Sequence, residues 1–274
     1  MSSQHSSAAR VAIVTGASGG IGRATAQALA QAGYRVFGTS RQRQQALPAG
    51  VEALECDVTS DTSVAAAVRS VIEQAGRIDL LVNNAGVGLL GAAEESSLEQ
   101  AKSLFDVNLF GVIRVTRAVL PAMRRQGAGR IVNISSVMGL IPAPYMALYA
   151  ASKHALEGYS ESLDHELRQV GVRVLLVEPA YTQTSFESHL VRPDRQLDDY
   201  QSARSNAEQV MREAMEKADA PVVVAQAVVA AANAEAPRAR YTAGATARQV
   251  SLLRRFVPRA AFDKSLRKQM RLPA

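Results

Sequence analysis

The sequence predicts an α/β protein built on a doubly wound parallel sheet of about seven strands. Short apolar runs alternate with longer segments of 3.6-residue apolar periodicity, which is the pattern of successive βα units. A glycine-rich turn directly follows the first apolar run and opens a helix-like segment. With 274 residues, of which 47% are apolar, the chain is long enough to bury the core of one such domain.

Each strand is placed on a short apolar run that is bounded by turn residues. The predicted strands are Val11–Thr15, Arg35–Thr39, Val51–Cys56, Leu80–Val82, Arg130–Ile134, Val172–Val177 and Arg240–Ala243. Because helix-length segments separate most neighbours in the sequence, we expect the strands to pair in parallel.

Two of the predicted helices are long, Leu98–Gln126 and Leu148–Val170. Ser96 and Glu99 have the spacing of a capping box at the start of the first. Residues 181–219 are rich in charge, carry no strand signal and follow the sixth strand. They are predicted to form a helical lid over the carboxyl ends of the strands.

The chain divides into a flexible leader (1–9), one α/β domain (10–245) and a basic C-terminal extension (246–274). The leader has no apolar segment typical of a secretion signal, and no apolar run reaches the roughly 18 residues of a membrane span. Cys56 is the single cysteine, which excludes an internal disulfide and a cysteine-based zinc site. No His/Asp/Glu cluster has metal-ligand spacing, so no metal is predicted. We expect a cytoplasmic protein.

The whole net charge of +6 comes from the last part of the chain. Residues 236–274 contain ten Lys/Arg and one acid, Asp263, and Pro258 is expected to break their helix. Apolar residues recur among these charges at Leu252, Leu253, Phe256, Val257, Phe262, Leu266 and Met270. This stripe is suited either to packing on the protein or a subunit interface, which we favour, or to an anionic membrane surface. Nucleic acid is not an expected partner, because no reading motif is present.

The first chemical motif is Thr-Gly-Ala-Ser-Gly-Gly-Ile-Gly, residues 15–22, between the first strand and a helix. Such spacing lets the turn close tightly and presents free N–H groups at a helix N-terminus to a pyrophosphate. It therefore predicts a dinucleotide site that includes Gly16, Ser18, Gly20, Ile21 and Gly22.

The same turn matches the Gly-x-Ser-x-Gly nucleophile elbow of serine hydrolases. Asp164 and then His189 would nominally complete a catalytic triad. We rank this reading far lower, because an elbow normally follows several strands and does not require the further glycine, Gly22.

The end of the second strand indicates which dinucleotide is preferred. An NAD site places an acidic side chain there to bind the ribose 2′-hydroxyl. Residues 35–50 contain no Asp or Glu, whereas Ser40, Arg41 and Arg43 offer a hydroxyl and two cations. Because guanidinium groups pair with phosphate, this predicts NADP(H).

Tyr149 and Lys153 are four residues apart, so a helix places them on one face. At ~4 Å and an effective dielectric near ~20, the ammonium would stabilise the phenolate by about 4 kcal/mol. That corresponds to a tyrosine pKa lowered by roughly three units, which would make Tyr149 an acid/base group near neutral pH.

Further motifs complete a set that resembles the short-chain dehydrogenase/reductase family, in its single-domain branch. Asn83-Asn84-Ala85-Gly86 follows the fourth strand, and Asn108 lies within a long helix, where asparagine is unfavourable. The resemblance covers roughly residues 10–245. One departure is Pro179-Ala180, where the family usually has Pro-Gly.

This resemblance implies a Rossmann-type catalytic domain that transfers hydride between NADP(H) and a carbonyl or secondary alcohol. Tyr149 would be the proton donor or acceptor, and Ser136, favoured over Ser135 by its spacing, would hold the substrate oxygen. Lys153 would lower the tyrosine pKa and bind the nicotinamide ribose, and Asn108 would hold a water. The implied cofactor contacts also include Asp57, Val58, Asn84, Ala85, Gly86, Pro179 and either Thr182 or Thr184.

The substrate is expected to be an apolar small molecule, by analogy with the hydroxysteroid- and retinol-type reductases of the family. Candidate pocket residues are Met138, Met146, Tyr181, Phe186 and Leu190. The alternatives are a same-fold enzyme that reduces a carbon–carbon double bond, and a non-catalytic nucleotide-binding regulator or membrane-surface adaptor. The two long helices correspond to those through which the family forms dimers or tetramers, so a homo-oligomer is expected.

Overall fold

The computed structural model describes residues 9–42, 46–186 and 189–272. In this part of the chain, seven strands form one parallel sheet in the order β3-β2-β1-β4-β5-β6-β7. The strands are β1 (Val11–Val14), β2 (Arg35–Ser40), β3 (Val51–Glu55), β4 (Leu80–Asn83), β5 (Gly129–Ile134), β6 (Val172–Pro179) and β7 (Arg240–Ala243). The predicted doubly wound sheet is therefore confirmed.

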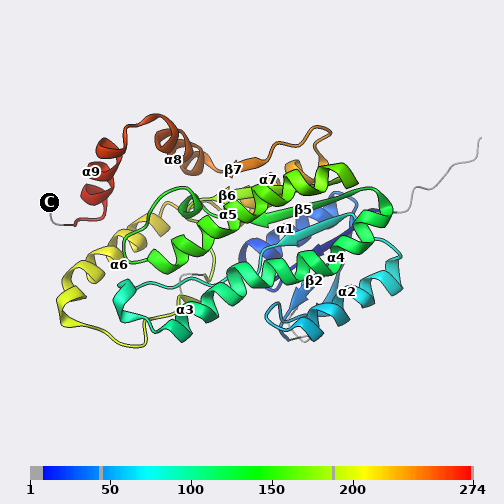
Figure 1. The fold of residues 1–274 in the computed structure, drawn as a ribbon, viewed down its shortest axis with the longest axis horizontal. Helices are drawn as coiled ribbons and strands as arrows, with labels where there is room; N and C mark the ends of the chain where they lie inside the picture. The colour runs from blue at the N-terminus through cyan, green and yellow to red at the C-terminus, as the bar shows by residue number, and fades with distance from the viewer. Residues whose placement is uncertain (1–8, 43–45, 187–188, 273–274) are drawn as a thin grey trace, which may run out of the picture.

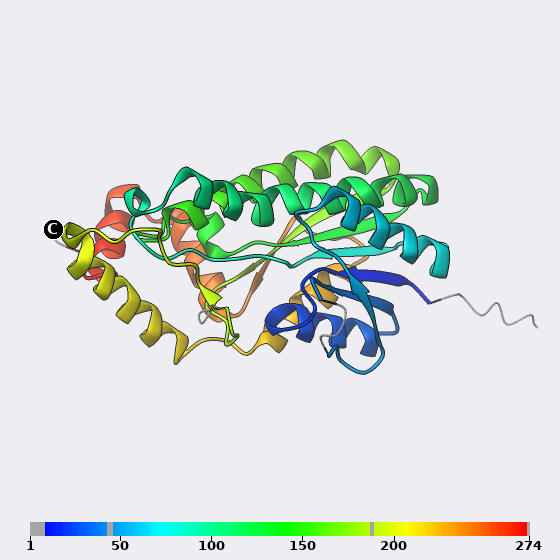
Figure 2. The same ribbon diagram turned by 90° about the horizontal axis from the view of Figure 1, so that it is seen from below.

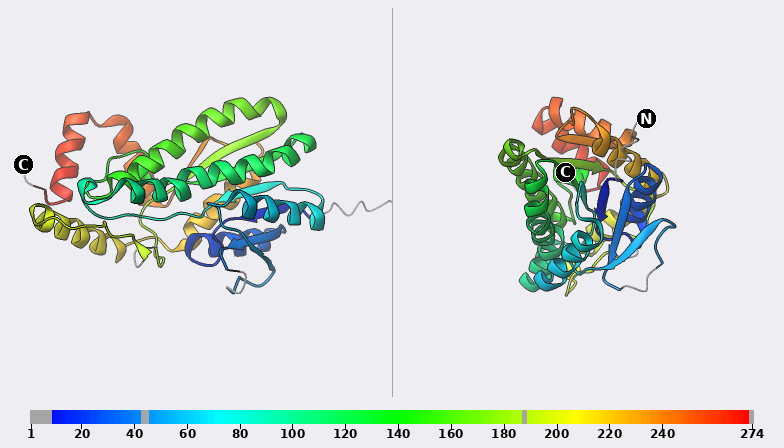
Figure 3. Two further views of the ribbon diagram at one scale, coloured as in Figure 1. Left: turned by 60° about the horizontal axis from the view of Figure 1, so that its bottom comes forward. Right: turned by 90° about the vertical axis from the view of Figure 1, so that its right-hand side faces the viewer.

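Helices cover both faces of this sheet (Figure 1). α1 (Gly20–Gln31) and α7 (Pro221–Asn233) pack side by side on one face. The other face carries α2 (Asp61–Ala75), α4 (Val112–Gln126) and α5 (Ala147–Leu167), as the end-on view of Figure 3 shows.

Successive side chains of each strand point to opposite faces of the sheet, so each face has its own apolar core. Val11 and Ile13 point into the core beneath α2, α4 and α5, whereas Ala12 and Val14 point into the core beneath α1 and α7. These β1 side chains are 2% exposed or less, because helices bury both faces of a parallel sheet. The apolar runs of the sequence follow from this double burial.

The strand order reverses at β1, which pairs with β2 on one side and with β4 on the other. The connections that leave β1 and β4 therefore diverge, and a crevice opens between the carboxyl ends of these strands. The glycine turn follows β1 and Asn84 follows β4, so the topology brings both motifs to this crevice.

The predicted helix Leu98–Gln126 is not continuous. It consists of α3 (Leu98–Phe105), a π-helical turn labelled η2 (Asp106–Gly111) and α4. Its cap is also one residue later than expected, because Ser97 Oγ accepts from Gln100 N at 3.1 Å while the buried Ser96 hydroxyl has no hydrogen-bond partner. α5 ends at Leu167 and continues as a 3₁₀ turn over Arg168–Val170 (η4), close to the predicted end.

Among its described residues, the lid segment is helical mainly in its second half. It contains a 3₁₀ turn, Asp198–Tyr200 (η6), and then α6 (Gln201–Met215). Before α6 the described backbone is anchored by two isolated bridges, Leu89 with Val191 and Thr182 with Asp219. Shorter 3₁₀ turns occur at Ala93–Glu95 (η1) and at Val137–Gly139 (η3), which follows β5.

The C-terminal extension forms α8 (Ala245–Phe256) and α9 (Arg259–Gln269), and the helix breaks at Pro258 as predicted. Figure 2 shows both helices at the same end of the molecule as α6. Within this single chain the apolar stripe does not pack on the protein at α8, where Leu252, Leu253 and Phe256 are exposed, and its packing across a subunit interface stays a prediction. In α9, Phe262, Leu266 and Met270 are half-buried. Within the described residues, no helix combines the length and apolarity needed to cross a membrane.

Candidate active site

A cavity of about 820 Å³ opens at the carboxyl ends of the strands. Its volume is in the range of sites for small ligands and cofactors. Nearly all the predicted site residues line it: Gly16, Ser18, Gly20, Ile21, Ser40, Arg41, Asp57, Val58, Asn84, Ala85, Gly86, Ser136, Tyr149, Lys153, Pro179 and Thr182. Gly22 and Asn108 are not among the lining residues and support the wall from behind.

The glycine turn is held by Asn84 from the neighbouring strand. Asn84 Nδ2 donates to Thr15 O at 2.9 Å and to Gly16 O at 3.2 Å. A Cβ atom on Gly22 would lie 2.3 Å from both Gly16 O and Asn84 Nδ2, so only glycine fits there. Gly16 and Gly20 have φ of +66° and +50°, which glycine adopts without steric cost.

The N-terminus of α1 faces the cavity without a side-chain cap. Gly19 is the N-cap residue, and no heavy atom lies within 4 Å of the position its Cβ would take. The first N–H groups of a helix have no partner within that helix and carry partial positive charge. This open, uncapped cradle fits the pyrophosphate of a dinucleotide, which the glycine motif predicts.

Ser40 and Arg41 form the end of the cavity beside β2. The pKa of Asp57 is lowered chiefly by hydrogen bonds from Thr59. The charge of Arg41, which is exposed, lowers it further. Asp57 Oδ1 accepts from Thr59 N at 2.9 Å and from Thr59 Oγ1 at 2.7 Å. Arg43, predicted to add charge here, lies outside the described residues.

Tyr149 lines the cavity from the first turn of α5. Its side chain is buried against the ring of Phe186, with the centroids 5.9 Å apart. Burial raises the pKa of Tyr149 to about 12, and a hydrogen bond with the Ser136 side chain acts in the opposite direction. Ser136 also lines the cavity and caps η3 through Met138 N at 3.1 Å.

Lys153 lies one turn beyond Tyr149, but its ammonium is directed to the sheet. Nζ donates to Ile134 O at 2.9 Å and lies 5.7 Å from the centre of the Tyr149 ring. Burial lowers the pKa of Lys153 to about 8. The expected lowering of the Tyr149 pKa by Lys153 is therefore not found in this arrangement, because desolvation of the phenol outweighs the more distant charge.

The side chain of Asn108 is fully engaged by protein groups. Oδ1 accepts from Val87 N at 2.9 Å, while Nδ2 donates to Val87 O at 2.9 Å and to Ser152 Oγ at 3.1 Å. Asn108 thus ties the π-helical turn to the segment after β4 and to α5. The predicted contact of Asn108 with a water stays a prediction.

A buried charge cluster lies behind Lys153 and was missed by sequence reasoning. Arg240 pairs at 3.0 Å with each of three carboxylates, those of Glu157, Glu161 and Glu178. Burial, reinforced by repulsion from Glu157, raises the pKa of Glu178 to about 7. One available signal was the spacing of Glu157 and Glu161, which follow Lys153 at successive turns of α5.

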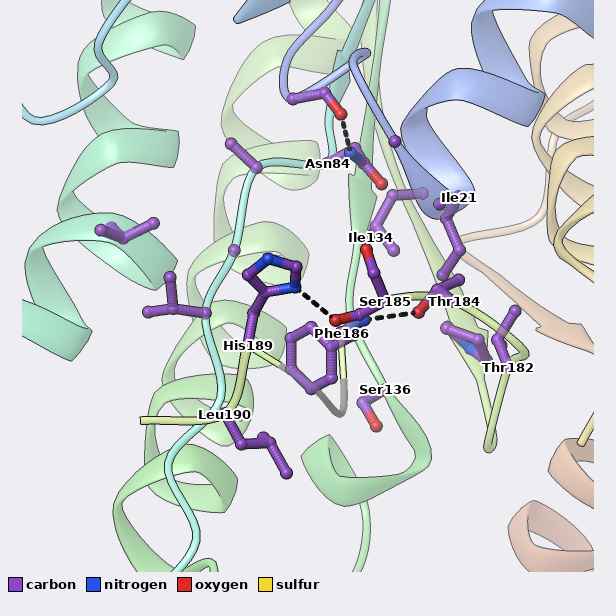
Figure 4. Close-up of a pocket in the computed structure, with 18 of the residues that line it drawn as sticks. Ile21, Asn84, Ile134, Ser136, Thr182, Thr184, Ser185, Phe186, His189 and Leu190 are labelled. Atoms are coloured by element: carbon purple, nitrogen blue, oxygen red, sulfur yellow. Dashed lines mark hydrogen bonds between the residues drawn. The ribbon is translucent and has the colours of Figure 1, made fainter. Parts of the chain in front are cut away.

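The part of the cavity around Tyr149 is apolar. All five predicted pocket residues, Met138, Met146, Tyr181, Phe186 and Leu190, line it. Figure 4 shows Phe186 and Leu190 on the irregular segment before α6, near Ser136. Met211 and Met215 of α6 also line the cavity and were not predicted, although their i, i+4 spacing on one helix face was a signal.

The hydrolase alternative is wrong. Asp164 is bonded to Arg168 and Arg173 and to Val174 N where β6 begins, at the opposite end of the parallel strands from Ser18. His189 Nδ1 is paired with Ser185 O at 2.6 Å. Neither residue therefore forms a triad with Ser18. Within the described ranges, no group of three His, Cys, Asp or Glu side chains could hold a metal ion.

Comparison with known proteins agrees with this geometry. The family model of short chain dehydrogenases matches residues 10–195. 3-Ketodihydrosphingosine reductase of Bacteroides thetaiotaomicron is 43% identical over 177 residues, or 65% of this chain and 65% of the reductase. The chain thus matches slightly less than two thirds of that relative. Human 17-beta-hydroxysteroid dehydrogenase type 1 is 38% identical over 84% of this chain and 76% of its own length.

Solved structures match nearly the whole chain. A short-chain dehydrogenase from Streptomyces avermitilis has a TM-score of 0.83 and 34% identity, covering 94% of this chain and 96% of its own. A Burkholderia phymatum enzyme in complex with NAD has a TM-score of 0.78 and 32% identity, covering 89% and 92%. A Burkholderia cenocepacia dehydrogenase in complex with NADP has a TM-score of 0.76 and 28% identity, covering 94% and 97%.

Proposed function

The chain belongs to the short-chain dehydrogenase family, and on that premise we propose that it transfers hydride between NADP(H) and a carbonyl or secondary alcohol. The observation that carries this proposal is the Tyr149 phenol at the cavity wall, hydrogen-bonded to the Ser136 hydroxyl. The uncapped N-terminus of α1 lies at the same cavity. One site thus offers a cofactor cradle and a proton donor.

The chain's own residues would hold the cofactor along the crevice. Gly19 and Gly20 would offer backbone N–H groups to the pyrophosphate, and Arg41 with Ser40 would bind the 2′-phosphate. Asp57 and the other lining residues named above would contact the adenosine and nicotinamide portions. The bound cofactor would supply the hydride.

Tyr149 would supply the proton. With a pKa raised to about 12, its phenol is protonated at neutral pH and is ready to donate to a carbonyl oxygen as that oxygen gains negative charge. The Ser136 hydroxyl would hold the same oxygen and keep it in line with the phenol. Lys153, fixed by Ile134, would place a positive charge beside the phenolate that remains.

The substrate would be an apolar carbonyl compound or alcohol. The cavity around Tyr149 is lined by methionines, Phe186 and Leu190, which favour apolar substrate surface and adapt to its shape. The names of two relatives point to a ketone on a long-chain base and to a hydroxyl on a steroid. Both combine a small polar reacting group with a large apolar body.

The two long helical segments would form a homo-oligomer, as the family resemblance implies. Leu98 of α3 is 73% exposed and Phe110 of η2 is 49% exposed on this chain. Exposed large apolar side chains on adjoining helices are suited to a subunit interface. Light scattering at micromolar concentration tests this expectation, and a monomer mass would contradict it.

The test of the reaction is NADPH consumption against a panel of apolar ketones, aldehydes, the corresponding alcohols with NADP⁺, and conjugated enones. Product analysis of the enone separates carbonyl reduction from double-bond reduction. We expect turnover of ketones, with the enone reduced at its carbonyl. Saturation of the carbon–carbon bond would favour the alternative enzyme, and nucleotide binding without turnover of any compound would favour a non-catalytic protein.

A further inference from the structure

α8 carries an apolar face that points away from the protein. Leu252, Leu253 and Phe256 lie on one side of the helix, because residues i, i+1 and i+4 share a face. They are 49%, 43% and 72% exposed. The opposite side of the helix contacts the body through buried Ala247 and through Arg254, whose Nε donates to Leu140 O at 3.1 Å.

Basic side chains border this apolar face. Arg248 and Arg255 are exposed at its edge, and the Arg255 guanidinium lies 5.4 Å from the centre of the Phe256 ring. The described residues of α8 and α9 contain one acidic side chain, Asp263. Their cations are Arg248, Arg254, Arg255, Arg259, Lys264, Arg267 and Lys268.

The extension also contacts two segments that contribute residues to the cavity lining. Arg254 contacts the segment that follows η3, and Met138 of η3 lines the cavity. Beyond α9, Arg271 pairs with Glu213 of α6 at 2.7 Å, and α6 contributes Met211 and Met215 to the lining. Figures 1 and 2 show α6, α8 and α9 gathered at one end of the molecule.

We propose that α8 docks this protein onto an anionic lipid bilayer, with Leu252, Leu253 and Phe256 inserted at the boundary of headgroups and acyl chains. Arg248 and Arg255 then face the anionic headgroups. Docking turns the apolar end of the cavity towards the membrane, from which an apolar substrate enters without crossing water. This last step rests on the proposed function, whereas the docking itself does not.

Charge complementarity favours an anionic bilayer, rather than a second copy of the chain, as the partner of the apolar face of α8. A two-fold symmetric contact would place the same face of α8 against itself and bring arginines of like charge together. An anionic lipid surface satisfies both the arginines and the apolar side chains. Nucleic acid would satisfy the arginines, but it leaves the two leucines without an apolar partner.

The experiment measures co-sedimentation of the full chain with vesicles that contain phosphatidylglycerol and with vesicles of pure phosphatidylcholine. Phe256→Gln is compared with Val222→Gln, because Val222 is 51% exposed and lies on α7, on another part of the surface. Arg248→Glu with Arg255→Glu is compared with Arg124→Glu with Arg125→Glu in the last turn of α4. Melting temperature confirms that each variant is folded.

We expect binding to the anionic vesicles only. Phe256→Gln should weaken it by about tenfold or more, since a buried phenylalanine contributes roughly that factor. The α8 charge reversals should abolish it, and neither control should change it. Equal binding of the α8 and control variants, or none by the unaltered chain, would overturn the proposal. So would a loss of oligomer mass in Phe256→Gln, or tighter binding to duplex DNA than to vesicles. Turnover of a water-dispersed substrate, measured in parallel, reports separately on the proposed function.

Discussion

Lys153 is bound to Ile134, the last residue of β5, by a hydrogen bond of 2.9 Å from its ammonium to the carbonyl oxygen. The end of a central strand, and not the Tyr149 phenol, therefore fixes where this positive charge lies. The contact joins the helix that carries Tyr149 to the strand that precedes Ser136. It also holds an ammonium in a buried place, where its charged form is disfavoured.

The first prediction concerns the pH dependence of ketone reduction. Burial lowers the pKa of Lys153 from 10.5 to about 8, so the ammonium loses its proton above that pH in the folded enzyme. The value of kcat/KM should fall as the pH rises through about 8. Between about pH 8 and pH 10.5 the folded chain releases a proton that the unfolded chain keeps. The free energy of unfolding therefore rises with pH in this window. A rate profile that stays flat to pH 10 would contradict the role of Lys153.

The second prediction concerns cofactor preference. Arg41→Ala should weaken NADPH binding by about ten- to a hundredfold, because a charge-assisted hydrogen bond to phosphate contributes about 1.5–3 kcal/mol. NADH binding should not change. Arg69→Ala, an exposed arginine on α2, is the matched control. Fluorescence titration of both nucleotides measures the effect, and tighter NADH than NADPH binding by the unaltered protein would refute the preference.

The third prediction concerns the glycine turn. In Gly22→Ala the new Cβ would lie 2.3 Å from Gly16 O, and the turn must shift to relieve that contact. Overpacking of this kind costs about 1–3 kcal/mol, so nucleotide affinity and thermal stability should both fall. Gly158→Ala is the control, because no heavy atom lies within 4 Å of its Cβ position in α5. Unchanged nucleotide affinity in Gly22→Ala would show that the turn does not form the cradle.

The fourth prediction concerns the buried charge cluster. Burial raises the pKa of Glu178 from 4.5 to about 7, so the folded chain keeps a proton that the unfolded chain releases between those values. The free energy of unfolding therefore falls as the pH rises through that window, and Glu178 accounts for at most about 3 kcal/mol of the fall. Glu178→Gln should remove the fall, whereas Glu161→Gln, whose side chain is 50% exposed, should not. Parallel melting curves of all three proteins against pH would disprove the assignment.

The strands and the glycine turn were predictable because their signals are local. A parallel strand buried on both faces appears in the sequence as an apolar run. In residues 15–22 the tight backbone of the turn itself requires the glycines. The π-helical turn Asp106–Gly111 was missed because the apolar periodicity continues across it. Ser96 and Ser97 are both good caps, so the sequence could not distinguish between them.

The parts of the site that were missed depend on contacts between distant segments. The direction of the Tyr149 pKa shift follows from burial beneath Phe186 of the lid segment, which spacing along α5 does not reveal. Arg240 lies far along the chain from Glu157 and Glu178, and only the pairing of β6 with β7 brings them together. The exposed face of α8 likewise became evident only once the body of the protein was in place.

The most direct test of the proposed reaction is the turnover of Tyr149→Phe, measured with NADPH and the best ketone of the panel. The change removes the transferable proton and keeps the ring that packs on Phe186, so fold and NADPH affinity should be retained. Tyr159→Phe is the control, because Tyr159 is also on α5 and its hydroxyl is bonded to Thr116 of α4, away from Ser136. The account predicts that kcat falls by about 10²- to 10⁴-fold in Tyr149→Phe alone. Unchanged turnover in that variant would contradict it.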